Sequence, residues 1–267
     1  MSQAEFEAAI AGNKPYFGPF LGCRRSWPHI YWFQQKLMKK LAGTHAASPF
    51  NILEVGSWAG ASTYSWAEGL QRYFAGNGHI VAVDVWSDTA TDAPDLVSAS
   101  EAAKEMFQHN MRAGCVAHLV EALQATSDEA FEMLRPRRFE LIYIDGDHSY
   151  EQVRRDIDNA QHLLTPNGII CGDDLEVQAD AVDPDIVDQA IAHKLGWAEH
   201  PERDIGFHPG VTRAVFETFG RVSEWGGFWA VAKNRDGWKS ISLDGIDALL
   251  PLPLLQYGED GQRLFAL

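Results

Sequence analysis

The chain has 267 residues, of which 46% are hydrophobic and 22% are charged. This balance is ordinary for a folded globular protein and excludes a disordered chain. The length allows one large α/β domain or a domain with additions. The formal net charge of −15 weighs against nucleic acid as a partner, because a nucleic-acid footprint is usually basic. It favours small-molecule or cationic ligands.

The spacing of the cysteines and the lengths of the apolar runs both indicate the cellular compartment of the protein. The three cysteines are widely spaced and form no Cys-x-x-Cys pair, which is typical of a reducing compartment. No apolar run approaches transmembrane length, and the first residues lack the basic and apolar segments of a signal peptide. We therefore expect a cytoplasmic protein with no membrane partner.

The first 48 residues are predicted to form an N-terminal arm and one helix, which act as a lid or cap. Residues 1–28 are irregular and rich in aromatic side chains and prolines. From His29 to Ala42, apolar residues recur every three to four positions, which indicates an amphipathic helix. Lys39, Lys40 and Gly43 are typical of a helix end.

A strand, a glycine loop, a helix and a second strand follow in that order. Phe50–Gly56 is an apolar run that leads into glycine, Ala61–Phe74 is predicted to be a helix, and His79–Asp84 is an apolar run ending in an acid. This order is typical of a right-handed βαβ unit that binds a nucleotide.

The remaining chain continues the alternation of helices and strands. We expect a surface loop at 87–100, helices at 100–111, 127–134, 149–163 and 186–195, and strands at 116–120, 139–144, 168–171, 212–216 and 227–232. The predicted fold is therefore α/β, a doubly wound, Rossmann-like seven-stranded mixed sheet ending in an antiparallel hairpin near 212–232. The domain would span 49–233, with a C-terminal extension at 234–267.

The glycine loop has the pattern E-x-G-x-x-x-G, formed by Glu54, Gly56 and Gly60. Tight turns also need glycine for conformational reasons alone, so the loop is informative mainly together with Asp84. An acid at the end of the next strand can accept both ribose hydroxyls. The dinucleotide pattern G-x-G-x-x-G is incomplete and Trp58 leaves less room for a pyrophosphate, which favours an adenosyl group without phosphates. A nicotinamide-dependent oxidoreductase is the alternative.

Four acids follow two neighbouring apolar strands. Asp145 and Asp147 come after the first strand, and Asp173 and Asp174 after the second. Ligands in such sheets bind at the carboxyl ends of parallel strands, so these carboxylates are expected around one point. Mutual repulsion would raise their pKa values, and a hard cation such as Mg²⁺ would relieve it. His148 either begins a helix or acts as a general base.

Two other residues are open to more than one interpretation. Trp86, just beyond Asp84, either stacks on an adenine or packs in the core. His208 has little beyond its location before the closing strands to mark it as functional.

A catalytically silent cofactor-binding protein is disfavoured by the two intact acid pairs.

Several segments together resemble class I S-adenosylmethionine-dependent methyltransferases. Residues 53–62 resemble the first motif of that class, 81–84 the second, 123–127 the segment beside the adenine, and 165–170 the turn before the fifth strand. The resemblance implies a cofactor site for S-adenosylmethionine. The implied residues are Glu54, Gly56, Ser57, Gly60, Ser62, Asp84, Trp86, Thr126, Ser127 and Asp145.

Within that class, residues 144–150, 172–174 and 209–217 are similar to a subgroup of metal-dependent sugar O-methyltransferases, the macrocin O-methyltransferase-like enzymes. By this resemblance Asp145, Asp173 and Asp174 would bind Mg²⁺ or another divalent cation, and Asp147 or His148 would be the base. The implied acceptor is a sugar or natural-product glycoside, and a catechol-like acceptor stays open. The oligomeric state, including a homo-oligomer, is open as well.

Overall fold

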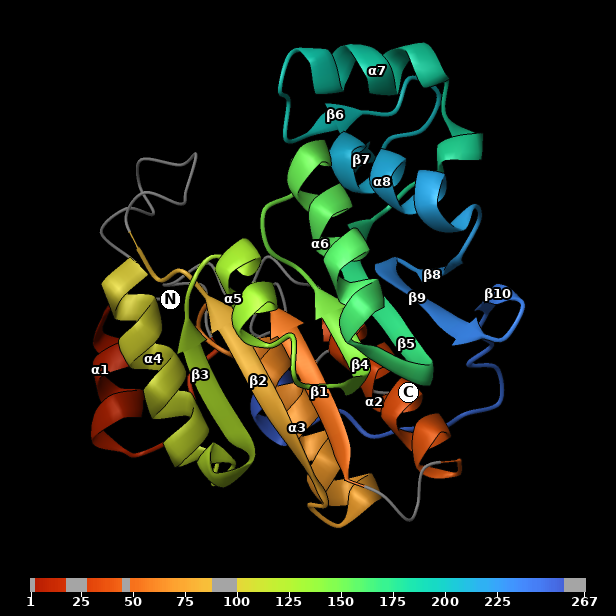
Figure 1. Ribbon diagram of the computed structural model, residues 1–267. Coiled ribbons are helices and arrows are strands. Elements are labelled where there is room, and N and C mark those ends of the chain that lie inside the picture. Colours follow the sequence, from red (N-terminus) through yellow and green to blue (C-terminus); the bar gives the residue numbers. More distant parts are fainter. Residues whose placement is uncertain (1–2, 18–27, 45–48, 88–99, 257–267) are drawn as a thin grey trace. The chain divides into compact units, whose positions relative to one another are not determined.

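The computed structural model describes residues 3–17, 28–44, 49–87 and 100–256 (Figure 1). Almost all of the loop predicted at 87–100, residues 1–2 and 18–27 of the N-terminal arm and the last residues of the C-terminal extension lie outside these ranges. The expectation that residues 1–28 are irregular is wrong for Gln3–Ala11, which is helical. Within them, no helix combines the length and the apolar character that crossing a membrane requires.

The chain divides into two compact units. The first contains Met1–Phe50, Ser57–Ala125 and Leu243–Leu267, and the second contains Asn51–Gly56 and Thr126–Ser242. Both units therefore take segments from separate parts of the sequence. The predicted domain limits at 49 and 233 remain a prediction.

The first unit is built mainly from helices around two parallel strands. Its elements are α1 (Gln3–Ala11), α2 (Pro28–Ala42), α3 (Ala61–Phe74), β2 (Gly78–Asp84), α4 (Ser100–Ala113), the 3₁₀ turns η3 (Ala117–Leu119) and η5 (Leu252–Gln256), and β3 (Val120–Gln124). Strands β2 and β3 pair in parallel, with Ile80 opposite Val120 and Asp84 opposite Gln124. The strand predicted at 116–120 is therefore wrong in position: the 3₁₀ turn occupies most of it, and the strand begins at Val120.

Helices α2 and α3 pack closely in this first unit. A Cβ atom at Gly69 of α3 would lie 2.8 Å from the Met38 Cγ atom of α2. Leu37 and Met38 are fully buried. The predicted amphipathic helix at 29–42 is thus confirmed, and its apolar stripe is buried as its periodicity indicated.

The second unit contains a mixed sheet with helices. Its elements are β1 (Phe50–Val55), α5 (Ser127–Met133), β4 (Phe139–Ile144), α6 (Tyr150–Leu163), β5 (Leu164–Leu175), η4 (Ala179–Ala181), α7 (Pro184–Ala192), β6 (Ala198–Glu199), β7 (Gly206–Phe207), α8 (Pro209–Phe219), β8 (Ser223–Trp225), β9 (Gly227–Asn234) and β10 (Gly237–Ser240). Strands β10, β9, β5, β4 and β1 are neighbours in that order (Figure 1). The predicted α/β class with a mixed sheet is confirmed.

Parallel pairing brings the ends of three strands to one edge of the second unit. Ile144, the last residue of β4, lies opposite Val55 of β1 and Gly172 of β5. The apolar residues of all three strands are buried, which fixes this register because a one-residue slip would turn each buried side chain to the other face. The chain that follows each strand therefore emerges at the same edge.

The closing hairpin differs from the prediction in one element. Residues 212–216 were predicted as a strand but belong to helix α8. Pro209 occupies the first turn of this helix, where its fixed φ is favourable, and Val211, Ala214 and Val215 are buried at helical spacing. The β-branched residues gave a misleading strand signal. The antiparallel hairpin is formed instead by β8 and β9, and β10 pairs with the later residues of β9 along the same edge, opposite β5.

Replacing Gly56 tests whether the close approach of Gly56, which follows β1, to Asp145, which follows β4, matters for stability. Gly56 has a φ of +88°, and a Cβ atom there would lie 1.9 Å from the Asp145 carbonyl oxygen. We expect Gly56→Ala to lower the free energy of unfolding by about 3 kcal/mol or more, because a clash adds to a backbone strain of about 1–3 kcal/mol. Urea unfolding followed by circular dichroism measures the change.

Gly76→Ala is the matched control, since Gly76 also has a positive φ, +72°, but nothing lies within 4 Å of the added Cβ atom. It should cost only the left-handed strain of about 1–2 kcal/mol. Equal losses for the two variants would show that the approach of Gly56 to Asp145 does not matter for stability.

Candidate active site

Asp145 is held at the end of β4 by contacts on both its main chain and its side chain. Its N–H donates to the Val55 carbonyl at 2.8 Å, which extends the pairing of β4 with β1 by one residue. The Tyr143 hydroxyl donates to Asp145 Oδ2 at 3.1 Å. The carboxylate therefore has a defined position before any ligand binds.

Asp147 lies in the turn between β4 and α6 and is exposed. Its Oδ1 atom accepts the N–H of Ser149 at 2.7 Å. Ser149 is the residue before the first turn of α6, and its own hydroxyl makes no capping bond. Asp147 thus stabilises the turn that starts the helix, a common role for aspartate.

Asp173 and Asp174 lie near the end of β5, and Asp174 has an unusual backbone conformation. Asp174 has a φ of +64°, which is uncommon for a residue with a side chain and costs conformational energy. Its N–H donates to Asp173 Oδ1 at 2.8 Å, and the Trp229 indole N–H donates to the Asp173 carbonyl at 3.2 Å. These bonds hold Asp174 in its strained conformation.

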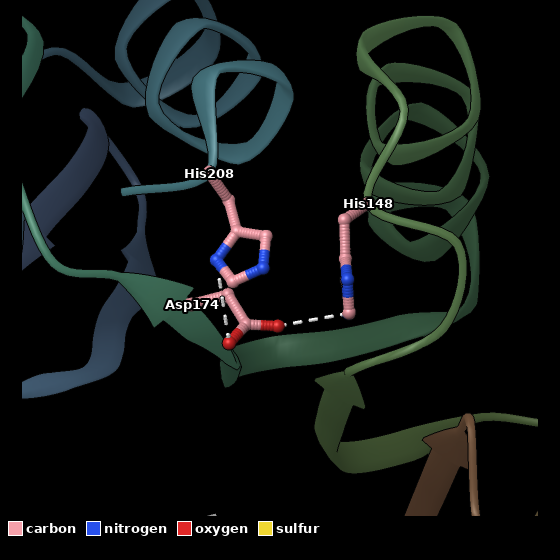
Figure 2. A group of neighbouring side chains, drawn as sticks. All are labelled: His148, Asp174 and His208. Carbon is pink, nitrogen blue, oxygen red and sulfur yellow. Dashed lines mark ion pairs between the residues drawn. The ribbon is translucent and has the colours of Figure 1, made fainter. Parts of the chain in front are cut away.

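His148 connects the acids that follow the two strands. Its Nε2 atom lies 2.8 Å from Asp174 Oδ2 and 3.8 Å from Asp145 Oδ1. Figure 2 shows the ring pointing from the start of α6 toward the Asp174 carboxylate. The sequence placed His148 near the acids, and the structure brings it into contact with one from each strand.

His208 joins this group from the residue before α8, and the sequence gave it no functional mark. Its Nδ1 atom lies 3.0 Å from Glu176 Oε1 and 3.6 Å from Asp174 Oδ1. Its ring centroid is 4.8 Å from that of His148. Glu176 lies two residues beyond Asp174 and was also missed, because its contact partner is distant in sequence.

Burial and mutual repulsion set the charges of this cluster. Burial raises the pKa of Asp173 well above its ordinary value, and the charges of Asp174 and Asp145 raise it further. Burial likewise raises the pKa of Asp145, with Asp174 adding to it and His148 opposing it. Burial also acts to raise the pKa of Asp174, but His148 and His208 outweigh it and lower that pKa.

The cluster borders a pocket within the second unit. Its lining residues are Ile144, Asp145, Gly146, Asp147, His148, Val153, Asp173, Val211 and Trp229. Four of the predicted metal and catalytic residues therefore face one cavity, while Asp174 contacts it through His148. Carboxylates with mutually repelled charges are suited to a hard cation. Among the described residues, however, the group whose potential ligand atoms all lie within 4.8 Å of one another is His148, Asp174 and His208, so the structure brings only Asp174 of the three predicted metal ligands into it.

The predicted cofactor residues Ser57, Gly60, Ser62, Asp84 and Trp86 belong to the first unit. Asp84 Oδ2 accepts the N–H groups of Ser57 at 3.0 Å and Trp58 at 2.8 Å. Asp84 Oδ1 accepts the N–H of Trp86 at 2.9 Å. Burial raises the pKa of Asp84, and these hydrogen bonds act to lower it. The carboxylate therefore organises the glycine loop itself.

Trp86 and Gly60 have clear packing roles in the same unit. The Trp86 ring is buried, with its centroid 5.0 Å from that of Phe107, and its indole N–H donates to the Trp58 carbonyl at 2.8 Å. Gly60 precedes α3 with a φ of +84°, and a Cβ atom there would lie 2.8 Å from Met111 and Phe107. These contacts show how the loop is held, and the cofactor roles of both residues remain predictions.

The other predicted cofactor residues lie in the second unit. Thr126 caps α5 through a reciprocal pair of bonds with Glu129, and Ser127 Oγ accepts from Gln152 at 2.8 Å. Glu54 is fully buried on β1. Gly56 lies so close to Asp145 that a Cβ atom on it would be 1.9 Å from the Asp145 carbonyl oxygen.

Comparison with known proteins finds a match for the segment that contains the glycine loop and the acids near the ends of β4 and β5. Residues 53–175 match the family model described as a methyltransferase domain. This segment of the chain is similar to a methyltransferase domain. This match agrees with the resemblance to methyltransferases, and it supports the expectation of an enzyme. The matched segment runs from the glycine loop to the residue after Asp174.

One curated relative and several solved structures are similar to the chain. The O-methyltransferase ankF from Aspergillus thermomutatus is 29% identical over 172 residues, which cover 58% of this chain and 64% of that protein. The chain thus matches less than two thirds of that relative's length.

Among solved structures, cofactor-bound Rv0187 from MTB is 20% identical with a TM-score of 0.48, covering 85% of this chain and 87% of that chain. An O-methyltransferase from Bacillus cereus in complex with SAH is 18% identical with a TM-score of 0.45, covering 86% of this chain and 90% of that chain. Likeness at this level says nothing about the substrate.

The protonation of His148 is a direct test of the cluster in metal-free protein. Burial acts to lower the pKa of His148, but contacts with Asp145 and Asp174 outweigh it and raise the pKa well above its ordinary value. We expect a ¹⁵N NMR titration with EDTA present to show a His148 pKa well above about 6.5, and Asp174→Asn to lower it. A His148 pKa at or below that value, unchanged in the variant, would contradict the described contacts. His193→Ala, at an exposed position in the same unit, should leave the His148 titration unchanged.

Proposed function

We propose that the protein is an S-adenosylmethionine-dependent O-methyltransferase that acts on a hydroxyl group of a small molecule with the help of a divalent cation. The observation that carries this proposal is the cluster of Asp145, Asp173 and Asp174 with His148 at one edge of the sheet. It lies at and just beyond the ends of two parallel strands within the matched methyltransferase domain. The curated relative, an O-methyltransferase, supports oxygen as the acceptor atom.

Asp84 and the glycine loop would hold the cofactor. The loop N–H groups fix one Asp84 oxygen, and an acid at this strand end can accept ribose hydroxyls. A sulfonium donor has no pyrophosphate, which agrees with a loop that contains Trp58 in place of a glycine. The same features disfavour the nicotinamide-dependent alternative.

Asp145, Asp173 and Asp174 would bind the divalent cation, with Mg²⁺ as the hard ion that prefers oxygen ligands. Such an ion lowers the pKa of a coordinated hydroxyl and orients it. The repulsion that raises the pKa values of Asp145 and Asp173 destabilises the folded protein when no cation is bound. A bound cation would relieve it by supplying positive charge.

Asp147 or His148 would accept the proton of the acceptor hydroxyl, and both line the same pocket. His148 can accept a proton only in its neutral form. The contacts with Asp145 and Asp174 raise the pKa of His148 and favour its protonated form, so neutralising those acids would increase the fraction of His148 that is neutral and able to accept a proton. Asp147 is exposed and already bonded through Oδ1 to the turn.

The acceptor is proposed to be a sugar or natural-product glycoside, on the basis of the sequence motifs at 144–150 and 172–174. Adjacent hydroxyls on a sugar ring can chelate one cation, and so can the two hydroxyls of a catechol. Both acceptors are therefore consistent with the cluster. Product analysis by mass spectrometry with both acceptor classes would distinguish them.

Cofactor binding is the first test. We expect isothermal titration calorimetry to show binding of S-adenosylmethionine and of its demethylated product, and Asp84→Asn to weaken both by about tenfold or more, since one good hydrogen bond to a charged group contributes about 1.5–3 kcal/mol. Asp158→Asn, an exposed substitution on α6, serves as the control and should not change affinity. Binding of NADH in place of the sulfonium would overturn the cofactor assignment.

Metal dependence is the second test. We expect EDTA to abolish methyl transfer and added Mg²⁺ to restore it. Asp174→Asn should lower kcat by about 100-fold or more, because metal stabilisation of developing charge contributes several kcal/mol. The affinity for demethylated cofactor should stay unchanged, which separates loss of the metal from loss of the fold. Full activity in EDTA would exclude a role for the cation.

A further inference from the structure

We propose that His208, oriented by Glu176, supplies a nitrogen ligand beside Asp174, so that the site prefers a divalent ion that binds imidazole well, such as Fe²⁺, Co²⁺ or Ni²⁺, over Mg²⁺. This inference rests on the proposed metal site and changes its ligand set. Mg²⁺ binds oxygen ligands and keeps several waters. Imidazole nitrogen is instead a favoured ligand of the later transition metals.

The first argument is the grouping of potential ligand atoms. One atom each from His148, Asp174 and His208 lies within 4.8 Å of the others. Ligands bound to one ion at about 2.0–2.2 Å lie at most about 4.4 Å apart. The group therefore needs only a small contraction to enclose an ion. Two imidazoles and one carboxylate around open positions are a known set for such metals.

The second argument is that Glu176 fixes His208 at two points. Glu176 Oε1 lies 3.0 Å from His208 Nδ1, and Glu176 Oε2 accepts the His208 main-chain N–H at 3.2 Å. A carboxylate that holds one ring nitrogen of a histidine fixes its tautomer and leaves the other nitrogen for a metal. In Figure 2 that other nitrogen is on the side of the ring facing His148.

The third argument is that the fold keeps the His208 ring in place. The Trp197 ring meets its edge at a centroid distance of 4.9 Å, and Trp197 is itself seated on Gly206, where a Cβ atom would lie 2.0 Å from the indole. The side chain of His208 is only 17% exposed. The ring is therefore preorganised beside Asp174, whether His148 binds the ion or accepts the substrate proton.

The test compares ions and variants by direct binding. Metal-free full-length protein is titrated with Co²⁺, Mn²⁺ and Mg²⁺ by calorimetry. We expect wild-type protein to bind Co²⁺ more tightly than Mg²⁺, and His208→Ala to weaken Co²⁺ by about 10–100-fold, the range for losing support of a metal site. The affinity for Mg²⁺ should change far less. Glu176→Gln should weaken Co²⁺ in the same direction by a smaller factor.

A spectroscopic signature and matched variants complete the test. Electron spin echo measurements on bound Mn²⁺ should show coupling to imidazole nitrogen that decreases in His208→Ala. His208→Asn, which keeps a polar side chain before α8, repeats the comparison if the alanine variant is unstable. His193→Ala, an exposed histidine in the same unit, should bind all three ions like wild type.

Two outcomes would overturn the inference, and they are distinguishable. If Co²⁺ and Mg²⁺ affinities respond equally to loss of His208, or neither responds, His208 is not a ligand, while the proposed metal-assisted reaction stands. If wild-type protein binds no divalent ion although it binds demethylated S-adenosylmethionine, the metal part of the proposed function fails together with this inference.

Discussion

The crowding of carboxylates at the ends of β4 and β5 is the constraint on which the candidate site depends. Parallel pairing places Ile144 opposite Gly172, so the acid that follows β4 and the two acids near the end of β5 must share one edge. Burial makes this arrangement costly, because a buried charge is unfavourable unless it is paired. His148 relieves part of the cost by contacting Asp174. The remaining repulsion supports the proposal that the cluster binds a cation.

Much of the fold and part of the site could be predicted from local sequence patterns. Apolar runs that end in acids, such as 139–145, indicate buried parallel strands, and their ends define where ligands bind. Helix α8 could not be predicted in this way, because Val211, Thr212 and Val215 have strand propensity. Tertiary contacts decide its conformation: the Thr212 hydroxyl donates to the Val177 carbonyl at 3.1 Å, and the apolar face packs inward.

His208 shows the limit of sequence reasoning about the site. It lies 34 positions after Asp174 in the numbering, and nothing adjacent to it forms a metal-binding pattern. Its contacts with Asp174 and Glu176 become visible only in the folded structure, where it lies just before α8. The strained φ of Asp174 is equally invisible in the sequence, since aspartate tolerates this conformation better than most residues. Strain of this kind concentrates at functional sites.

The most direct measurement of the central claim is anomalous diffraction from crystals of the protein soaked with Mn²⁺ and demethylated S-adenosylmethionine. The account predicts one strong anomalous peak within about 2.2 Å of an Asp174 oxygen, a typical metal–ligand distance, with the cofactor bound in the same crystal. A crystal that contains the bound cofactor and no anomalous peak beside Asp174 would contradict it.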